Sequence, residues 1–210
     1  MTQRTAALLD HFVPARGAPA LAAAARSVAC AAGGVLLLAL LSQVRVPIGP
    51  VPVTGQTLGV LLVGAAFGAP LGLATVALYL ALGACGLPVF AGGQAGLAYA
   101  LGPTGGYLVG FALAAALLGR LSARGWDRSV LTCAAAMLLA NAAIYLPGLL
   151  WLRHYLGLDW GATLAAGLAP FVLGDLVKLT IAAAALPGAW RLAGRGAARE
   201  GSLRRRADAG

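Results

Sequence analysis

Two opposite charges, Asp175 and Lys178, lie inside an apolar stretch that runs from Pro170 to Pro187. Three residues apart on a helix, their side chains share one face, so they can neutralise each other or hold one polar group between them. A charged side chain at the centre of a membrane costs roughly 3 kcal/mol, so such residues usually face the bundle interior and have a function. An ion pair that only fixes the register of the helices is the alternative interpretation.

The composition is that of an integral membrane protein. Of the 210 residues, 60% are hydrophobic and 10% are charged, whereas about a quarter of the residues in soluble domains are charged. No charged residue occurs between Arg45 and Arg120, an interval that has room for several membrane spans of about 20 residues each. The net charge of +9 comes from arginines at the ends of apolar segments and in the C-terminal tail, a distribution typical of cytoplasmic membrane faces and not of nucleic-acid binding.

Six apolar segments predict an all-α bundle of six transmembrane helices. The predicted helices cover residues 27–44, 54–68, 71–85, 104–121, 129–151 and 161–189. A tight turn at residues 68–70, which read Gly-Ala-Pro, separates the second helix from the third. We divide the chain into a cytoplasmic lead-in (residues 1–25), a transmembrane domain (26–190) and a basic cytoplasmic tail that we expect to be disordered (191–210).

The distribution of basic residues predicts the orientation in the membrane. Six spans place both termini on one side, where twelve basic residues then lie, while only Arg45 and Arg153 lie on the other. The positive-inside rule therefore predicts that both termini are cytoplasmic. The loops at residues 45–53, 86–103 and 153–160 then face outward. The first two are rich in glycine or proline, and irregular apolar backbone is tolerated near a membrane only where it packs in protein or lines a cavity.

The sequence lacks the motifs of several enzyme classes. The single lysine follows Val177, so the chain has no Gly-Lys-Ser/Thr loop with which to bind ATP itself. His11 and His154 lie far apart and the three cysteines are isolated, so we expect no metal and no cofactor. No serine lies in a Gly-x-Ser-x-Gly elbow. We therefore expect binding or transport of a small molecule and no catalysis.

Five motifs follow one another along the transmembrane domain in a specific order and spacing. They read PVPVTGQT (50–57), GLPVFAGG (86–93), GPTGGYLVGF (102–111), NAAIY (141–145) and PFVLGDLVK (170–178). Together they resemble the BioY family, the biotin-specific substrate-capture subunits (S components) of energy-coupling factor (ECF) transporters. The resemblance covers about residues 25–190. It implies a six-helix fold in the bacterial cytoplasmic (inner) membrane that captures biotin at the outer face and delivers it with a shared transmembrane coupling subunit and ATPase subunits.

The resemblance also implies a substrate-binding site. Asp175 and Lys178 match the acidic and basic binding pair of the family. The other matching positions are Phe90, Gly92 and Gly93 in the lid and Thr54, Gln56, Asn141 and Tyr145 around the pocket. The Asp175 carboxylate can accept the ureido N–H bonds of biotin, while Lys178 can donate to a ligand oxygen. That oxygen is either the ureido carbonyl or the valerate carboxylate.

Three small residues, Ala25, Ala29 and Gly33, resemble the surface that the family presents to the coupling subunit. They lie four apart at the start of the first predicted helix, and small residues let another helix approach closely. Two other functions remain open. One is a self-sufficient or proton-coupled secondary biotin carrier in which Asp175 and Lys178 exchange protons. Such carriers often have an inverted repeat and a second broken, charged helix, and we find neither in the sequence. The other is a structural membrane subunit without a ligand.

Overall fold

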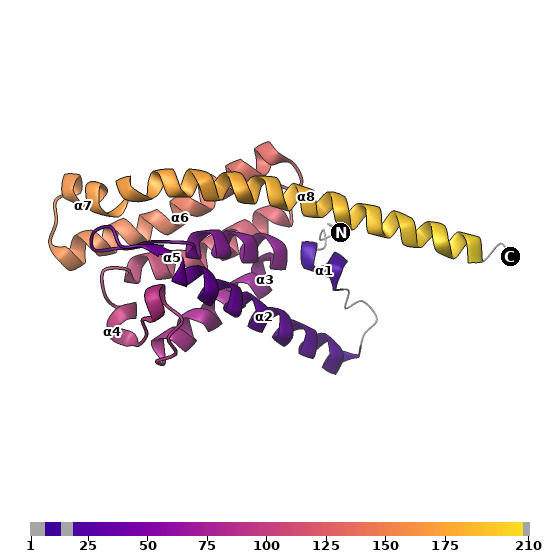
Figure 1. The fold of residues 1–210 in the computed structure, drawn as a ribbon, viewed down its shortest axis with the longest axis horizontal. Coiled ribbons are helices and arrows are strands. Elements are labelled where there is room, and N and C mark those ends of the chain that lie inside the picture. Colours follow the sequence, from indigo (N-terminus) through magenta and orange to yellow (C-terminus); the bar gives the residue numbers. More distant parts are fainter. Residues whose placement is uncertain (1–6, 14–18, 208–210) are drawn as a thin grey trace.

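The computed structural model describes residues 7–13 and 19–207, with side chains up to residue 193, as a mostly helical bundle (Figure 1). Its long helices are α2 (Ala20–Gln43), α3 (Gln56–Ala84), α5 (Gly105–Ser122), α6 (Val130–Leu156) and α8 (Ala169–Ala207). The shorter elements are α1 (Leu8–Phe12), β1 (Arg45–Val46), β2 (Val53–Thr54), the 3-10 helix η1 (Ala91–Gly93), α4 (Leu97–Ala100) and α7 (Trp160–Gly167). Among the described residues, five helical stretches are long and apolar enough to cross a membrane, with α7 and the first part of α8 forming the fifth.

Helix α3 folds back on itself at Gly68. This glycine has φ 75° and ψ 170°, a backbone conformation that is open almost only to glycine. Beyond it, Gly72 lies against the backbone of Gly64. Gln56 at the start of α3 hydrogen-bonds to Tyr79 near its end, with 2.6 Å between Nε2 and the hydroxyl oxygen, although a straight helix would hold these residues about 35 Å apart. The two halves therefore lie side by side and antiparallel, joined by the turn predicted at residues 68–70.

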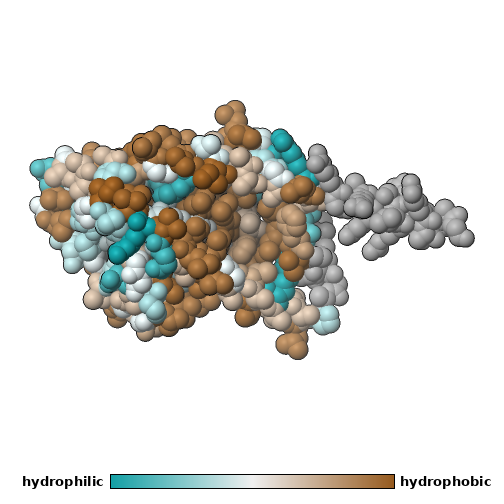
Figure 2. Space-filling model, viewed as in Figure 1, coloured by the Kyte–Doolittle hydropathy of each residue, from teal (hydrophilic) through white to brown (hydrophobic). Residues whose placement is uncertain are grey.

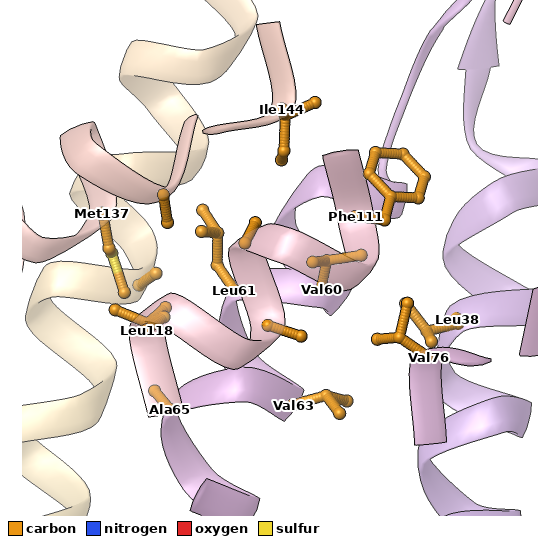
Figure 3. Close-up of a cluster of buried hydrophobic side chains, with 14 of the residues drawn as sticks. Leu38, Val60, Leu61, Val63, Ala65, Val76, Phe111, Leu118, Met137 and Ile144 are labelled. Carbon is orange, nitrogen blue, oxygen red and sulfur yellow. The ribbon is translucent and has the colours of Figure 1, made fainter. Parts of the chain in front are cut away.

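Helix α5 is the central helix of the bundle and is mostly buried. It packs closely against α3 and α6 because glycines lie at the crossings. A Cβ atom on Gly64 of α3 would lie 2.9 Å from the Cα of Ala115, and a Cβ on Gly110 would lie 2.6 Å from the Cα of Ile144. Larger buried side chains pack around these crossings (Figure 3), among them Val60, Leu61, Phe111, Leu118 and Met137. The short distances between helices bring the polar side chains described below within reach of one another.

The two ends of the bundle differ. The β1–β2 hairpin, α4 and α7 lie at one end, which we call the loop end, while α1 and the C-terminal part of α8 lie at the other (Figure 1). Apolar side chains cover the middle of the face seen in Figure 2, and polar ones gather toward the loop end. Large apolar side chains are exposed on several helices, including Leu40, Leu113, Leu138 and Leu173. Exposed apolar surface of this extent is typical of contact with a membrane.

The helices differ from the sequence prediction most at three places. Helix α2 begins at Ala20, seven residues before the predicted start, because residues 20–25 are rich in alanine, the strongest helix former. The predicted sixth helix is interrupted at Leu168, since Pro170 has no N–H group to continue the hydrogen bonds of α7. The backbone of α8 continues as helix through the basic tail to Ala207, where we expected disorder. Residues 1–6 and 14–18 of the predicted lead-in and residues 208–210 of the tail lie outside the described residues.

Replacing Gly64 with valine should destabilise the fold, because a branched side chain would overlap the backbone of Ala115. Overpacking of this kind costs about 1–3 kcal/mol, so we expect a lower Tm in detergent solution. The matched control is Gly33→Val on the exposed face of α2, where nothing lies within 4 Å of a Cβ. Equal Tm values for the two variants would contradict the close packing of α3 on α5.

Candidate binding site

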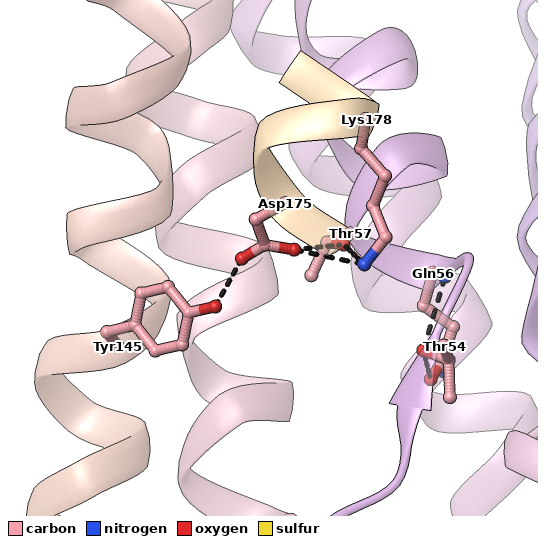
Figure 4. A network of polar contacts seen from close by, with 6 residues as sticks. All are labelled: Thr54, Gln56, Thr57, Tyr145, Asp175 and Lys178. Atoms are coloured by element: carbon pink, nitrogen blue, oxygen red, sulfur yellow. Dashed lines mark hydrogen bonds and ion pairs between the residues drawn. The ribbon is translucent and has the colours of Figure 1, made fainter. Parts of the chain in front are cut away.

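A buried polar network joins α8 to α3 and α6 (Figure 4). The Nζ atom of Lys178 lies 3.0 Å from Oδ1 of Asp175, and the two side chains are 13% and 9% exposed. Lys178 also donates to Oγ1 of Thr57 at 2.8 Å, and the Thr57 hydroxyl lies 3.5 Å from Oδ1 of Asp175. The hydroxyl of Tyr145 donates to Oδ2 of Asp175. Side chains from three helices therefore meet at one carboxylate.

The network satisfies the carboxylate more completely than the ammonium group. Asp175 accepts hydrogen bonds on both of its oxygens. A lysine ammonium group has three N–H donors, whereas Lys178 makes two hydrogen bonds within the described residues. One N–H of Lys178 is therefore uncommitted at a position that lines a cavity.

A second chain of hydrogen bonds connects the β1–β2 hairpin to the loop between α3 and α5. Thr54 donates to Oε1 of Gln56 at 2.9 Å, and Nε2 of Gln56 donates to the hydroxyl of Tyr79 at 2.6 Å. Tyr79 in turn donates to the carbonyl of Val89 at 2.9 Å. Because Val89 belongs to the loop at residues 86–103, which we call the lid loop, these side chains tie that loop to the bundle.

The two networks border one cavity near the loop end. Its aromatic lining consists of Tyr99, Tyr107, Phe111, Tyr145 and Phe171, and its polar lining consists of Thr54, Gln56, Thr57, Thr104 and Lys178. The Tyr107 ring is stacked on Phe171 with 6.0 Å between centroids. Burial raises the pKa of the Tyr99 hydroxyl, so this group stays a neutral hydrogen-bond donor. Apolar walls with a few converging polar groups are typical of small-molecule sites.

The chain was compared with known protein families, and one of these families matches most of its length. The model of the BioY family matches residues 13–195. The chain belongs to the BioY family. The Pyrococcus horikoshii protein named probable biotin transporter BioY is 41% identical over 158 residues, which cover 75% of this chain and 92% of the relative. The biotin transporter BioY of Thermotoga maritima is 38% identical over 147 residues, covering 70% and 85% of the two chains.

A solved structure shares the fold of this BioY family member. It is a crystal structure of the S-component for biotin from an ECF-type ABC transporter. The TM-score is 0.74 at 25% sequence identity, and the match covers 83% of this chain and 95% of that chain. The similarity to an S component that the sequence predicted is therefore confirmed for the fold.

The structure brings several of the predicted site residues together. Thr54, Gln56, Tyr145 and Lys178 line the cavity, and Asp175 lies directly behind the wall because it is hydrogen-bonded to Tyr145 and Lys178. These residues come from β2, α3, α6 and α8. Their convergence is a finding of the structure, whereas their contact with a substrate stays a prediction.

Asn141 lies elsewhere. It belongs to an apolar groove between α6 and α8 that also includes Leu138, Val172 and Asp175, and it is not part of the cavity lining. The Asn141 side chain is buried, and its Oδ1 has no hydrogen-bond partner in the part of the chain that the structure describes. The structure therefore places Asn141 beside the Tyr145–Asp175 hydrogen bond and outside the cavity.

The three predicted lid residues do not line the cavity either. Phe90 is completely buried, stacked on Tyr99 at 5.1 Å and edge-on to Tyr79 at 5.7 Å between centroids. Gly92 and Gly93 have φ values of 68° and 74°, which turn the backbone back on itself. In this structure the side chain that the lid loop contributes to the wall is Tyr99, and Phe90 anchors the loop beneath it.

Some cavity residues were not predicted from the sequence. Thr57 follows Gln56 within a motif that we quoted, and a polar residue in an apolar span was the signal available for it. Phe171 lies four residues before Asp175 and therefore on the same face of α8. Tyr99 and Tyr107 reach the cavity only through the packing of α4 and α5, for which the sequence has no local signal.

The small-residue surface predicted on α2 is open in the structure. Ala25, Ala29 and Gly33 are exposed, and nothing lies within 4 Å of a Cβ atom built on Gly33. The neighbouring Gly34 instead packs on Thr75 and Phe67. The predicted face is thus accessible, as is most of α2, while its role in binding a coupling subunit stays a prediction.

Replacing Tyr145 with phenylalanine should destabilise the protein by about 1.5–3 kcal/mol, because it removes a hydrogen bond to a buried charged group. We expect a lower Tm in detergent solution. Tyr155→Phe on the same helix is the control, since half of this side chain is exposed. If the two variants lowered the Tm equally, the Tyr145–Asp175 hydrogen bond would not contribute to stability.

Proposed function

We propose that this protein captures biotin at the outer face of the cytoplasmic membrane and acts as the S component of an ECF transporter. Membership of the BioY family supports this proposal, as do relatives named biotin transporters and the structural similarity to an S component for biotin. The observation that carries it is the network of Asp175, Lys178 and Thr57 beside an aromatic-walled cavity.

In this proposal six helices cross the membrane. The two antiparallel halves of α3 count as two crossings, and α2, α5, α6 and the stretch α7–α8 supply the other four. With an even number of crossings, α1 and the C-terminal part of α8 share one side, in agreement with their position at one end of the bundle (Figure 1). The excess of basic residues assigns that side to the cytoplasm. The loop end, with the cavity beneath it, then faces the outside.

The residues at the cavity match the chemistry of biotin. The ureido group of biotin offers two N–H donors and one carbonyl acceptor. The Asp175 carboxylate can accept from an N–H, and the uncommitted N–H of Lys178 can donate to an oxygen of the ligand. The rings of Tyr107 and Phe171 offer apolar surface to the thioether ring and the alkyl chain. One N–H and the carbonyl of the ureido ring thus have complementary groups on the protein.

Entry of biotin requires the lining to move apart. The cavity holds about 30 Å³ of space for the centres of water-sized molecules, and one water needs about 10–15 Å³, so it has room for roughly two waters. The β1–β2 hairpin supplies Val51 and Pro52 to the lining and is held by only two paired positions. We expect the hairpin and the lid loop to open for the ligand and close over it.

Purified wild-type protein should bind biotin, and Asp175→Asn, Lys178→Met and Thr57→Val should bind it at least tenfold more weakly. A hydrogen bond to a charged group contributes about 1.5–3 kcal/mol, or roughly tenfold to hundredfold in affinity. Equilibrium binding of labelled biotin to the detergent-solubilised protein measures this. Thr180→Val is the matched control, because Thr180 lies on the same helix but is exposed and its hydroxyl donates to the carbonyl of Leu176 in its own helix.

The binding experiment also tests the structural reading of the ion pair. A wild-type protein that ignored biotin, or variants that kept its affinity, would overturn the proposed function. Variants that failed to fold, together with a wild-type protein that binds no biotin, would support a purely structural pair.

A proton-coupled secondary carrier is the alternative. It is favoured by one observation: Tyr145, Asp175 and Lys178 form an unbroken chain of titratable groups. We propose instead that energy comes from partner subunits that bind the exposed small-residue face of α2. In vesicles, we therefore expect biotin accumulation only when the coupling subunit, the ATPase subunits and ATP are present. Accumulation driven by a proton gradient in vesicles with this chain alone, and lost in Asp175→Asn, would establish the carrier instead.

The proposed partner surface has its own control within the same assay. Ala29→Leu should reduce ATP-dependent uptake severalfold and leave biotin binding unchanged, because a bulky side chain keeps a partner helix away. Ala24→Leu adds the same bulk to an exposed position on another face of α2. Equal uptake by the two variants would exclude this face as the coupling surface.

A further inference from the structure

Arg45 lies where the hairpin, the lid loop and the cavity meet. In the β1–β2 pair it is directly opposite Thr54, and opposite residues of an antiparallel pair project from the same face. Thr54 lines the cavity, so the side chain of Arg45 leaves the hairpin on the cavity side. Arg45 is itself exposed, which places its charge at the rim.

The guanidinium group rests on the lid loop. A Cβ atom at Gly92 would overlap Nε, Cζ and Nη1 of Arg45, so the planar group packs directly on the backbone of Gly92. The charge also acts on the hydroxyl of Tyr99, whose pKa it lowers against the larger effect of burial. Since Tyr99 belongs to the cavity wall, the guanidinium lies between the lid loop and that wall.

The positive charge of Arg45 is not neutralised. Within the described residues Arg45 makes no ion pair or hydrogen bond, since the ion pairs there are Arg26–Asp10 and Lys178–Asp175. The other arginine near the loop end, Arg153, is stacked on Trp160 at 4.8 Å. A guanidinium with free N–H groups is the preferred partner for a carboxylate, which it can bind through two parallel hydrogen bonds.

The deep part of the site has the opposite electrostatic character. Asp175 and Lys178 compensate each other, so their surroundings suit a neutral group that both donates and accepts hydrogen bonds. A ligand carboxylate beside this pair would add a second negative charge, which no further cation of the pair compensates, in a poorly solvated environment. Of the two polar ends of biotin, the neutral ureido group therefore fits the deep pair and the charged carboxylate fits the rim.

We infer that Arg45 binds the carboxylate of the ligand at the cavity rim and so fixes the ligand with its ureido ring at Asp175 and Lys178. This inference rests on the proposed function. It assigns the oxygen that Lys178 contacts to the ureido carbonyl, and it makes Arg45 the residue that selects for an anionic ligand.

The test compares biotin with biotin methyl ester, which keeps the ureido ring but carries no negative charge. We expect wild-type protein to bind the ester at least tenfold more weakly than biotin. Arg45→Gln should lose about the same factor for biotin and bind the ester as wild type does. Arg153→Gln is the matched control and should behave like wild type with both compounds. The Tm of each variant in detergent solution confirms that it is folded, as expected for an exposed side chain.

The outcomes separate the inference from the proposed function. If Arg45→Gln kept its preference for biotin over the ester, or weakened both compounds equally, the carboxylate would bind elsewhere and the inference would fall while biotin capture stood. If wild type bound neither compound, both would fall. Loss of the biotin preference in Arg45→Gln alone, with retention of part of it in Arg45→Lys, would establish the contact.

Discussion

The arrangement of the helices depends on one buried carboxylate, which protein groups must hydrogen-bond in place of water inside an apolar bundle. Removing a charge from water costs several kcal/mol, and only nearby hydrogen bonds and an opposite charge can offset that cost. Asp175 obtains its partners from three helices: Thr57 from α3, Tyr145 from α6 and Lys178 from its own helix. Each partner must stay within hydrogen-bond distance, so the carboxylate fixes the positions of α3, α6 and α8 relative to one another.

The same requirement explains why the proposed site suits a polar ligand. In a purely apolar cavity, the ureido group of biotin would lose its hydrogen bonds to water and gain none from the protein. Here the charges are already desolvated and held by the fold, and Lys178 still has one N–H uncommitted. A ligand that supplies the missing acceptor therefore completes a network whose desolvation cost was already offset when the protein folded. Preorganisation of this kind reduces the entropy lost on binding.

Close helix packing makes this geometry possible, and the sequence predicts only part of it. Some features are local patterns that can be predicted from the sequence alone: the two charges in an apolar run, the membrane spans and the turn at residues 68–70. The rotation of each helix about its axis depends on tertiary contacts. Asn141 and Tyr145 lie four apart on one face of α6, yet only the longer Tyr145 side chain reaches the cavity, and Asn141 remains in the outer groove. Similarly, the lid-loop residues predicted at the site were Phe90, Gly92 and Gly93, whereas the structure places the ring of Tyr99 in the cavity wall and Phe90 below it.

Helix α2 connects the lid loop to the exposed surface at the other end of the bundle. Its last turn carries Ser42, whose hydroxyl is buried 2.8 Å from the carbonyl of Val89, and Gln43, whose Nε2 lies 3.4 Å from the carbonyl of Phe90. Opening the lid loop must either break these hydrogen bonds, each of which contributes about 0.5–1.5 kcal/mol, or carry the end of α2 along. Because a helix of this length is stiff, a displacement at Ser42 would also displace the face that carries Ala29 and Gly33. The lid loop and the small-residue face are therefore joined by one continuous helix.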